Sequence, residues 1–562
     1  MSTSVSIQTN QEKAHGQAGR RETLARLLMF APLLVCVLLM LPRLVSPHFG
    51  LFDDGTTIIR AQEIASGTWN LEEDLEAGRT RPLYWLFYTA TYSLFGANPF
   101  WFFVVNTLVL AGTALGILYL VRQMGGSRLQ AGLTALLFAL SGPVIENFYT
   151  LSKAEPLQMA LLVLSMVWLA PFARLNRRWK KGLAFLAATL TLLLAAAAKE
   201  TTLFVFPISA VWLAAAWIRR LRGSSEGFEA RGTYFLANGL AVAGSLALRS
   251  LFVSQGLTSG SYTNGYVIDP ARMLSAALSW LGWLGRDFIY LVPLVLLAVA
   301  VFVARKKISQ EVLLFDSLVW MAAWVAVYLP WSFTIEYYLL PFAFGFSFFA
   351  GILLVQALDL LKTASQPWRI AVGALLGVTL ILFLVTQANN ATNARIQLTI
   401  DEANAEVLDF VAANAPQGAT VLVNIQFSNE YIRQIRSHLT ALRHRSDLSV
   451  DQFKFQGIDP NEPGLEPHFI LSPSITNQPL LAVRMGEVEE TQVTWNKTLK
   501  STLDVNWTTI LTTNHAFPML NIDIPRLFCP LAPALDYCAL SIPIIDRRAF
   551  TYGWTVYNLE LP

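Results

Sequence analysis

The sequence is poor in charged residues, cysteine and histidine. Charged residues make up only 14% of the 562 residues, well below the roughly 25% of soluble domains. With 3 cysteines and 6 histidines, no zinc-type spacing occurs, and there is no P-loop, dinucleotide fingerprint or long repeat. The net charge of +3 gives no electrostatic support to a nucleic-acid partner. These absences point away from nucleotide-binding enzymes of the common types and from nucleic-acid-binding proteins.

Apolar residues are abundant instead, at 54% of the chain. A membrane-spanning helix needs about 20 mainly apolar residues. About eleven runs approach that length, near 27–46, 100–121, 130–147, 156–172, 182–198, 203–218, 233–252, 287–304, 312–330, 339–357 and 369–387. The first run is too long for a signal-peptide core and lacks a convincing small-residue cleavage site. The sequence therefore predicts a polytopic α-helical membrane protein, with a transmembrane domain over 27–387.

Lysine and arginine gather in the loops on one side of these runs. The basic positions lie in the N-terminal tail, at 122 and 128, in 174–181, in 219–222, in 305–307 and at 362 and 369. Because cytoplasmic loops carry an excess of lysine and arginine, we expect all of them to be cytoplasmic. Residues 1–26 would be a disordered cytoplasmic tail. An odd number of spans then places the C-terminal segment outside.

Two adjacent carboxylates, Asp53 and Asp54, follow the first apolar run in the segment HFGLFDDG. They open the first outer loop, about 46–99. Charge beside a membrane span is costly unless it has a function or a polar cavity around it. Such a pair could bind a cation, carry a proton or deprotonate a hydroxyl. The alternative is that Asp54 caps the short helix expected over 56–66, which Gly67 would end.

Other polar residues fall on the same outer face. They are Arg79 and Arg81 in the first outer loop, Lys153 and Glu155 in the second, Lys199 and Glu200 after the fifth run, and Glu336 and Tyr337 before the tenth. A shared cavity could hold a charged headgroup whose tail lies in the lipid. Arginine and lysine suit phosphate. The alternatives are headgroup anchors at the arginines, a solvated loop at Lys153 and Glu155, a snorkelling pair at 199–200 and a rim residue at Glu336.

The order of these segments resembles a known family. FDDG, a short helix, ASGTW and RPLYWLFYTATYSLFG, which suits an interfacial helix, look like the start of GT-C glycosyltransferases. YTLSKAEPLQMALL, AAAKETTLFVFP and EYYLLPFAFGF are similar to later family segments, so that the resemblance covers roughly residues 20–360. The nearest branch holds protein O-mannosyltransferases and lipid A aminoarabinose transferases. The chain departs from the pattern in its number of spans and in Glu155, where aspartate is frequent.

The resemblance implies an activity and roles for the residues. Family members transfer a sugar from a polyprenyl-phosphate carrier to a lipid, glycan or protein acceptor outside the cytoplasm, with inversion. Asp53 is then expected to be the base, with Asp54 supporting it and Glu155 completing the acidic cluster. Arg79, Arg81, Lys153 and Lys199 would bind the donor phosphate, and Glu200, Glu336 and Tyr337 would line the cavity. No cofactor is required, although a divalent ion on Asp53, Asp54 and Glu155 is plausible. The expected location is the bacterial plasma membrane.

After about residue 388 the composition becomes polar. The segment 388–416 reads as a helix and 418–425 as a strand, and HFILS, QPLLAVRM and TQVTWN are strand-like. We expect residues 388–562 to form an extracytoplasmic α/β or α+β domain. Cys529 and Cys538 could form a disulfide there, or remain free thiols. Cys36 lies within the first run and is expected only to pack.

Two other classes of function compete with the transferase. A transporter or flippase of lipid-linked or polar substrates would place charges near mid-membrane and break paired spans. A non-catalytic scaffold presenting the outer domain would give no reason for acidic residues in successive outer loops. The concentration of polar residues on one face favours the transferase.

Overall fold

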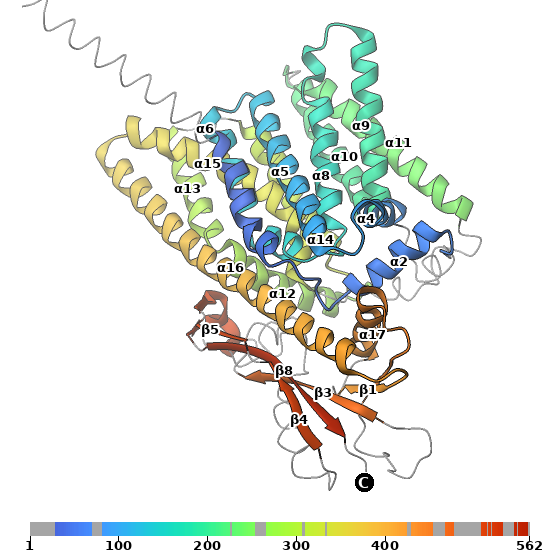
Figure 1. Ribbon diagram of the computed structural model, residues 1–562. Coiled ribbons are helices and arrows are strands. Elements are labelled where there is room, and N and C mark those ends of the chain that lie inside the picture. The colour runs from blue at the N-terminus through green and yellow to red at the C-terminus, as the bar shows by residue number, and fades with distance from the viewer. Residues whose placement is uncertain are drawn as a thin grey trace, which may run out of the picture.

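The structure is a computed structural model of the whole chain. It describes residues 29–69, 81–224, 227–252, 266–305, 310–331, 334–423, 429–452, 467–476, 507–513, 515–518, 520–531, 544–547 and 549–559. Helices form one large body, and a β-sheet lies at one end of it (Figure 1). The long helix α16 runs along the helical body and continues to the sheet (Figure 1).

A helix lies at each apolar run of the sequence. The helical body contains Met29–Val45, α5 (Pro99–Gln123), α6 (Arg128–Ala139), α7 (Gly142–Phe148), α8 (Glu155–Leu169), η1 (Phe172–Arg174), α9 (Arg178–Ala198), η2 (Glu200–Phe204), α10 (Val205–Leu221), α11 (Phe228–Phe252), α12 (Pro270–Phe288), α13 (Leu291–Arg305), α14 (Glu311–Val327), η4 (Glu336–Leu339), α15 (Leu340–Thr363) and α16 (Gln366–Asn414). In the described part, six helices are long and apolar enough to cross a membrane, or up to eight if each bent pair is one span. The chain is therefore an integral membrane protein, while the count of about eleven spans stays a prediction.

Two helices precede α5 on the side that faces the sheet. They are α2 (Asp54–Ser66) and α4 (Pro82–Phe95). Gly67 ends α2 in the left-handed region at φ 74°, which a residue without a Cβ adopts at little cost. The helix expected over 56–66 and the helix expected after Pro82 are both confirmed.

The C-terminal part holds a mixed sheet. Its elements are β1 (Thr420–Val423), α17 (Asn429–Arg443), β2 (Ser449–Gln452), β3 (Pro467–Thr476), β4 (Trp507–Thr512), β5 (His515–Pro518), β6 (Asn521–Ile522), η5 (Ile524–Leu531), β7 (Ile545–Asp546) and β8 (Ala549–Leu559). The main sheet has the order β2-β1-β3-β8-β4, with β5 also pairing with β8. β1 is parallel to β2 and β3, while β8 is antiparallel to its partners. The strand-like segments QPLLAVRM and TQVTWN lie outside the described residues.

The helix expected after residue 388 is not a separate element. It is the second half of α16, a single helix of 49 residues. No glycine or proline occurs between Gly377 and Pro416, so nothing interrupts the backbone where the side chains change from apolar to polar. The expected domain boundary therefore falls inside a continuous helix, which ties the sheet to the transmembrane body.

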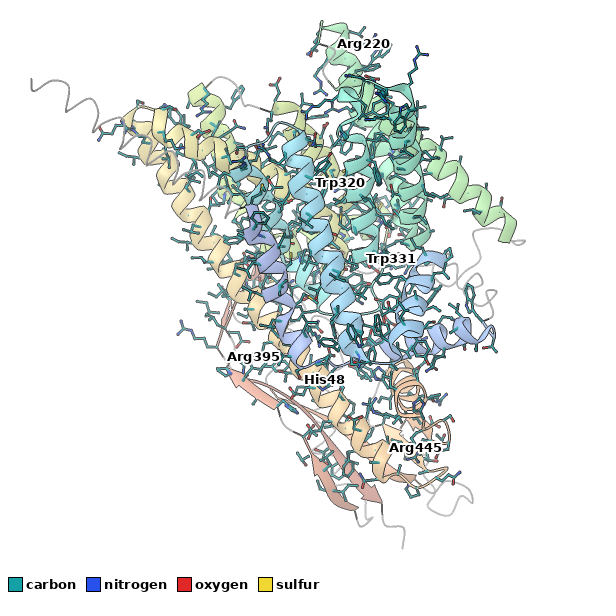
Figure 2. All side chains as sticks on the ribbon, turned by 45° about the horizontal axis from the view of Figure 1, so that its top comes forward. His48, Arg220, Trp320, Trp331, Arg395 and Arg445 are labelled. Carbon is teal, nitrogen blue, oxygen red and sulfur yellow. The ribbon has the colours of Figure 1, made fainter. Side chains whose placement is uncertain are left out.

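One of the basic loops and the C-terminal part lie at opposite ends of the molecule. Arg220, at the end of α10, lies at the end of the helical body away from Arg445 of the C-terminal part (Figure 2). Arg220 belongs to one of the basic loops expected in the cytoplasm. This arrangement is consistent with the expected orientation, which stays a prediction.

Cysteines take two different environments. Cys529, in η5, is disulfide-bonded, and Cys538, its expected partner, lies outside the described residues. Cys36 is free and fully buried among apolar side chains. The expectation that Cys36 only packs is confirmed.

A buried ion pair joins the first helix to α16. Arg43 Nη2 lies 2.7 Å from Asp401 Oδ2, and the two side chains are 0% and 7% exposed. The guanidinium also lies over the rings of Phe103, at 5.1 Å, and Tyr149, at 5.5 Å. Four separate segments therefore meet at one cation, ten residues before the acidic pair.

We expect a variant that lacks one member of this pair to be less stable than a variant that lacks both. Asp401→Leu leaves a buried guanidinium uncompensated, which costs roughly 3–5 kcal/mol. The double variant Arg43→Met/Asp401→Leu should recover much of that loss. Thermal unfolding of the purified protein in detergent measures this.

The exposed pair Lys181–Glu229 serves as the control, because its side chains are 28% and 57% exposed. Lys181→Met should cost about 1 kcal/mol at most. Equal losses from Asp401→Leu and Lys181→Met would contradict the role given to Arg43 and Asp401.

Candidate functional site

The acidic pair sits on a strained turn. Asp53 has φ 67°, in the left-handed region, and is followed directly by α2. For a residue with a Cβ, such a conformation costs on the order of 1–3 kcal/mol and persists only where the surroundings enforce it. Asp53 makes no side-chain capping bond, and Asp54 Oδ2 accepts a hydrogen bond from the Gly50 N–H at 2.8 Å, upstream of the helix. Helix capping therefore does not account for the two carboxylates.

Asp54 is the more deeply placed of the two. It is 3% exposed, whereas Asp53 is half-buried. Burial, together with the smaller effect of the Asp401 and Asp53 charges, raises the pKa of the Asp54 carboxyl to about 7, although the Ser152 side chain and the Gly50 N–H each lower it. Asp54 is therefore poised to gain or lose a proton near neutral pH.

Aromatic residues of α4 join α2 to the turn before α8. The Tyr84 hydroxyl lies 3.3 Å from Thr57 Oγ1 on α2. Tyr88 contacts the backbone of Ser152 and Lys153 and lies near Asp54. Asp54 thus lies near the loop that carries Lys153, although the two are about 100 residues apart in sequence.

Glu155 and Lys199 form a buried ion pair, and each side chain is 3% exposed. Glu155 begins α8, where the positive end of the helix dipole favours a carboxylate. The Lys199 ammonium also lies 4.8 Å from the ring centre of Tyr338 and 6.0 Å from that of Tyr337. Both expected site residues are brought together, but each neutralises the other.

Lys153 is different because its ammonium has no carboxylate within ion-pair distance among the described residues. It is half-buried and lies 4.5 Å from the ring centre of Tyr337. The same ring is therefore shared with Lys199. A half-buried cation held by an aromatic face can bind an anionic ligand without first breaking an ion pair.

Arg81 and Glu200 form a bidentate pair. Arg81 Nε and Nη2 donate to Glu200 Oε2 and Oε1 at 2.9 and 2.7 Å. This pair links the start of α4 to the start of η2. An expected phosphate ligand, Arg81, and an expected cavity residue, Glu200, therefore neutralise each other. Arg79, the fourth expected phosphate ligand, lies outside the described residues.

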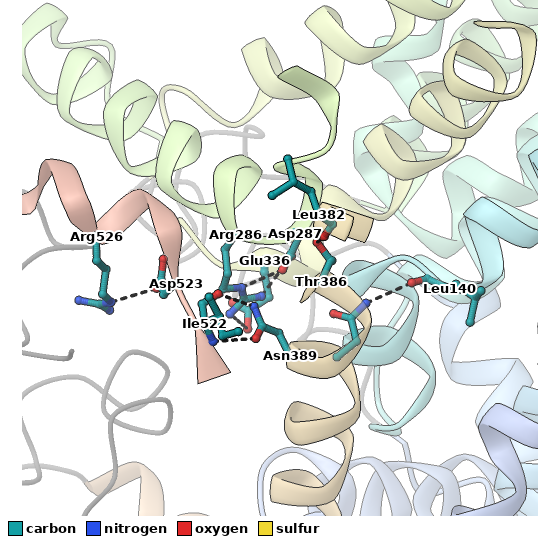
Figure 3. A network of polar contacts seen from close by, with 11 residues as sticks. Leu140, Arg286, Asp287, Glu336, Leu382, Thr386, Asn389, Ile522, Asp523 and Arg526 are labelled. Atoms are coloured by element: carbon teal, nitrogen blue, oxygen red, sulfur yellow. Dashed lines mark hydrogen bonds and ion pairs between the residues drawn. The ribbon is translucent and has the colours of Figure 1, made fainter. Parts of the chain in front are cut away.

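Glu336 belongs to a neighbouring network (Figure 3). Arg286 Nε and Nη2 donate to Asp287 at 2.8 and 3.1 Å, and Arg286 Nη1 lies 3.8 Å from Glu336 Oε1. Asn389 of α16 exchanges two hydrogen bonds, of 2.7 and 2.9 Å, with the backbone of Ile522 beside it. Glu336 therefore contacts Arg286 of α12, in the same region as the bonds by which Asn389 ties α16 to the C-terminal part.

The carboxylates expected to hold a divalent ion do not fit that role. Asp53, Asp54 and Glu155 do not form a ligand group, and no cluster of three or more His, Cys, Asp or Glu residues that could hold a metal occurs in the part of the chain that the structure describes. Glu155 is engaged by Lys199, and Asp53 Oδ1 accepts a hydrogen bond from Gln434. We therefore derive no chemistry through a metal.

Several residues of the site gave no signal in the sequence. Ser152 has φ 57° and lies beside Asp54. Asp401 lies with Asp54 around Gly50, since a Cβ at Gly50 would meet oxygens of both at 3.4 Å. Gln434 and His438 reach the acidic segment from α17. Burial and the charge of Arg443 lower the pKa of His438 to about 3, so its ring is neutral.

Comparison with known proteins finds likenesses among solved structures. No protein-family model and no curated protein matches it. ArnT from Cupriavidus metallidurans bound to undecaprenyl phosphate is similar with a TM-score of 0.44 and 12% identity, over 89% of this chain and 96% of ArnT. The Archaeoglobus fulgidus oligosaccharyltransferase is similar with a TM-score of 0.47 and 12% identity, over 80% of this chain and 69% of that one.

Both proteins are members of the GT-C superfamily, the family that the sequence resembles. Their TM-scores lie below 0.5, so the likenesses carry no argument about the chemistry of this chain. The function proposed below is built from its own side chains.

The close fit of α2 against α17 predicts the effect of one added methyl group. A Cβ at Gly55 would lie 2.6 Å from His438 Cδ2 and 2.9 Å from the His438 backbone nitrogen. Gly55→Ala should therefore displace α17 and lower stability by about 1–3 kcal/mol, although alanine favours helix by roughly 0.5–1 kcal/mol. Thermal unfolding measures the difference.

Gly112→Ala in α5 is the matched control, because nothing lies within 4 Å of a Cβ there. This variant should be as stable as the wild type or slightly more so. If the two alanine variants unfold at the same temperature, the packing of α17 on α2 is not as described.

Proposed function

We propose that the protein is an inverting membrane glycosyltransferase that moves a sugar from a polyprenyl-phosphate carrier to an acceptor hydroxyl outside the cytoplasm. The observation that carries the proposal is that Asp54 lies beside Ser152, the residue directly before Lys153. Asp54 is a buried carboxyl with a pKa of about 7, and Lys153 is a cation with no carboxylate within ion-pair distance among the described residues.

The proposed reaction is a direct displacement. The acceptor oxygen forms a bond to the anomeric carbon while the bond from that carbon to the phosphate oxygen breaks. The acceptor proton passes to the Asp54 carboxylate, and the bonding electrons leave with the lipid phosphate. A phosphate is a stable anion and needs a cation rather than a strong general acid.

The roles differ in part from those expected. Asp53 was the expected base, but its carboxylate bonds to Gln434 and it is the less buried of the pair. The geometry favours Asp54 as the base. Glu155 would hold Lys199 in place, and Lys199 would add positive charge near Tyr337. Lys153 would be the main phosphate ligand, and the ring of Tyr337 would hold its ammonium by a cation–π contact.

Sugar transfer by the purified protein is the test of this assignment. With a panel of polyprenyl-phosphate sugars, Asp54→Asn should lower turnover by about 10²–10⁴-fold, the usual effect of losing a general base. The kcat/KM should increase with pH, with the midpoint of the increase near pH 7, because the protonated Asp54 carboxyl cannot accept a proton.

Asp53→Asn is the matched comparison and should retain more turnover than Asp54→Asn. The reverse order of the two variants would return the role of base to Asp53. Movement of a lipid-linked sugar across vesicles by the wild type, without transfer to any acceptor, would favour a flippase instead.

Lys153→Met should weaken both donor use and binding of the lipid phosphate product. The expected loss in kcat/KM is about tenfold to a hundredfold, which corresponds to the roughly 1.5–3 kcal/mol of a hydrogen bond to a charged group. Undecaprenyl phosphate is a suitable binding probe. Lys362→Met, which removes a cation that is 71% exposed, should change neither quantity, and equal behaviour of the two variants would sink the assignment.

A further inference from the structure

Helix α17 of the C-terminal part lies against the acidic segment with one face (Figure 1). That face carries Tyr431, Gln434, His438 and Ala441, spaced three, four and three residues apart along the helix. Tyr431 stacks edge-on against Phe52 at 4.7 Å, and the Ala441 carbonyl accepts a hydrogen bond from Gln62 at 3.4 Å. The contact therefore runs from the residue before the acidic pair into the third turn of α2.

Gln434 is the polar residue at the centre of this face. Its Oε1 accepts a hydrogen bond from the Asp53 N–H at 3.0 Å, and its Nε2 donates to Asp53 Oδ1 at 3.4 Å. The side chain is fully buried. One amide thus engages both the backbone and the carboxylate of the same residue, which neither glutamate nor methionine could do.

The residue that Gln434 holds is the strained one. Asp53 has φ 67°, and its conformation sets the direction in which the next residue leaves the turn. If residue 53 relaxed to an ordinary backbone conformation, Asp54 would turn away from Gly50 and Ser152. The neighbouring contact of Gly55 with His438 blocks the same movement from the other side of Asp54.

We propose that Gln434 is a positioning residue for sugar transfer, and that the C-terminal domain supplies it to hold the left-handed turn at Asp53 so that Asp54 faces the turn of Ser152 and Lys153. The inference rests on the proposed function. It gives the outer domain a part in the reaction, and it makes the Asp53 carboxylate a partner of Gln434 rather than a base.

Gln434→Met in the full-length protein tests this role, because methionine keeps the buried volume and loses both hydrogen bonds. We expect kcat to fall at least tenfold, the KM for the donor to stay within twofold and the unfolding temperature to change little. Gln130→Met is the matched control. It removes a buried glutamine that bonds to Gln310 at 2.8 Å at the start of α6, and kcat should stay within twofold.

An exchange of the two side chains separates positioning from catalysis by Asp53. In Asp53→Asn/Gln434→Glu, the asparagine N–H groups can donate to the glutamate, so that the reciprocal pair is restored with the carboxylate on the other helix. Kcat should recover to within about threefold of wild type, above either single variant, as expected for coupled neighbours.

The outcomes distinguish this inference from the proposed function. Full kcat in Gln434→Met overturns the positioning role. A loss in Gln434→Met that the exchanged pair does not repair overturns it as well, because the Asp53 carboxylate would then be needed itself. A wild type that transfers no sugar from any donor overturns the proposed function, and the positioning role with it.

Discussion

The buried contact between Arg43 and Asp401 is the constraint on which the site depends. Arg43 ends the first helix, and Asp401 lies on the part of α16 that leaves the transmembrane body. A guanidinium with no exposure to water must be paired, so the first helix, α16 and the rings of Phe103 and Tyr149 are drawn to one point. The carboxylate of Asp401 also lies over Gly50. The start of the acidic segment is therefore tied to the half of α16 that continues to the C-terminal sheet.

Most of the buried charges around this point neutralise one another. Glu155 pairs with Lys199, and Arg81 pairs with Glu200. These pairs shape the site and leave little net charge in it. Asp54 and Lys153 are the exceptions: Asp54 lies near the charges of Asp53 and Asp401, and Lys153 lies over the Tyr337 ring, with the Glu336 charge acting on it from beyond ion-pair distance. Chemistry that moves a proton and an anion is best placed at such unmatched groups.

The sequence predicts the site where the energetic cost of a residue can be judged from its neighbours in the chain. Asp53 and Asp54 stand out because charge directly after an apolar run is expensive, and Gly67 marks the end of α2 for backbone reasons. The pair Glu155–Lys199 joins residues 44 positions apart, and no pattern along the chain predicts which loops meet. Gln434 gives no signal at all, since glutamine is ordinary in a polar helix. The boundary expected at 388 reflects the change from apolar to polar side chains. The backbone of α16 continues past it to Asn414, two residues before Pro416.

The backbone conformation at Ser152 separates the Asp54 side of the site from the Lys153 side. Ser152 and Lys153 are neighbours in sequence, yet Ser152 lies beside Asp54 while the Lys153 ammonium lies over Tyr337. The left-handed φ of 57° at Ser152 turns the chain between them, and such a conformation persists only where packing enforces it. Direct displacement at a sugar needs its base and its phosphate-binding cation on opposite sides of the reacting carbon. In the proposed reaction the acceptor hydroxyl therefore lies on the Asp54 side of this turn and the phosphate on the Lys153 side.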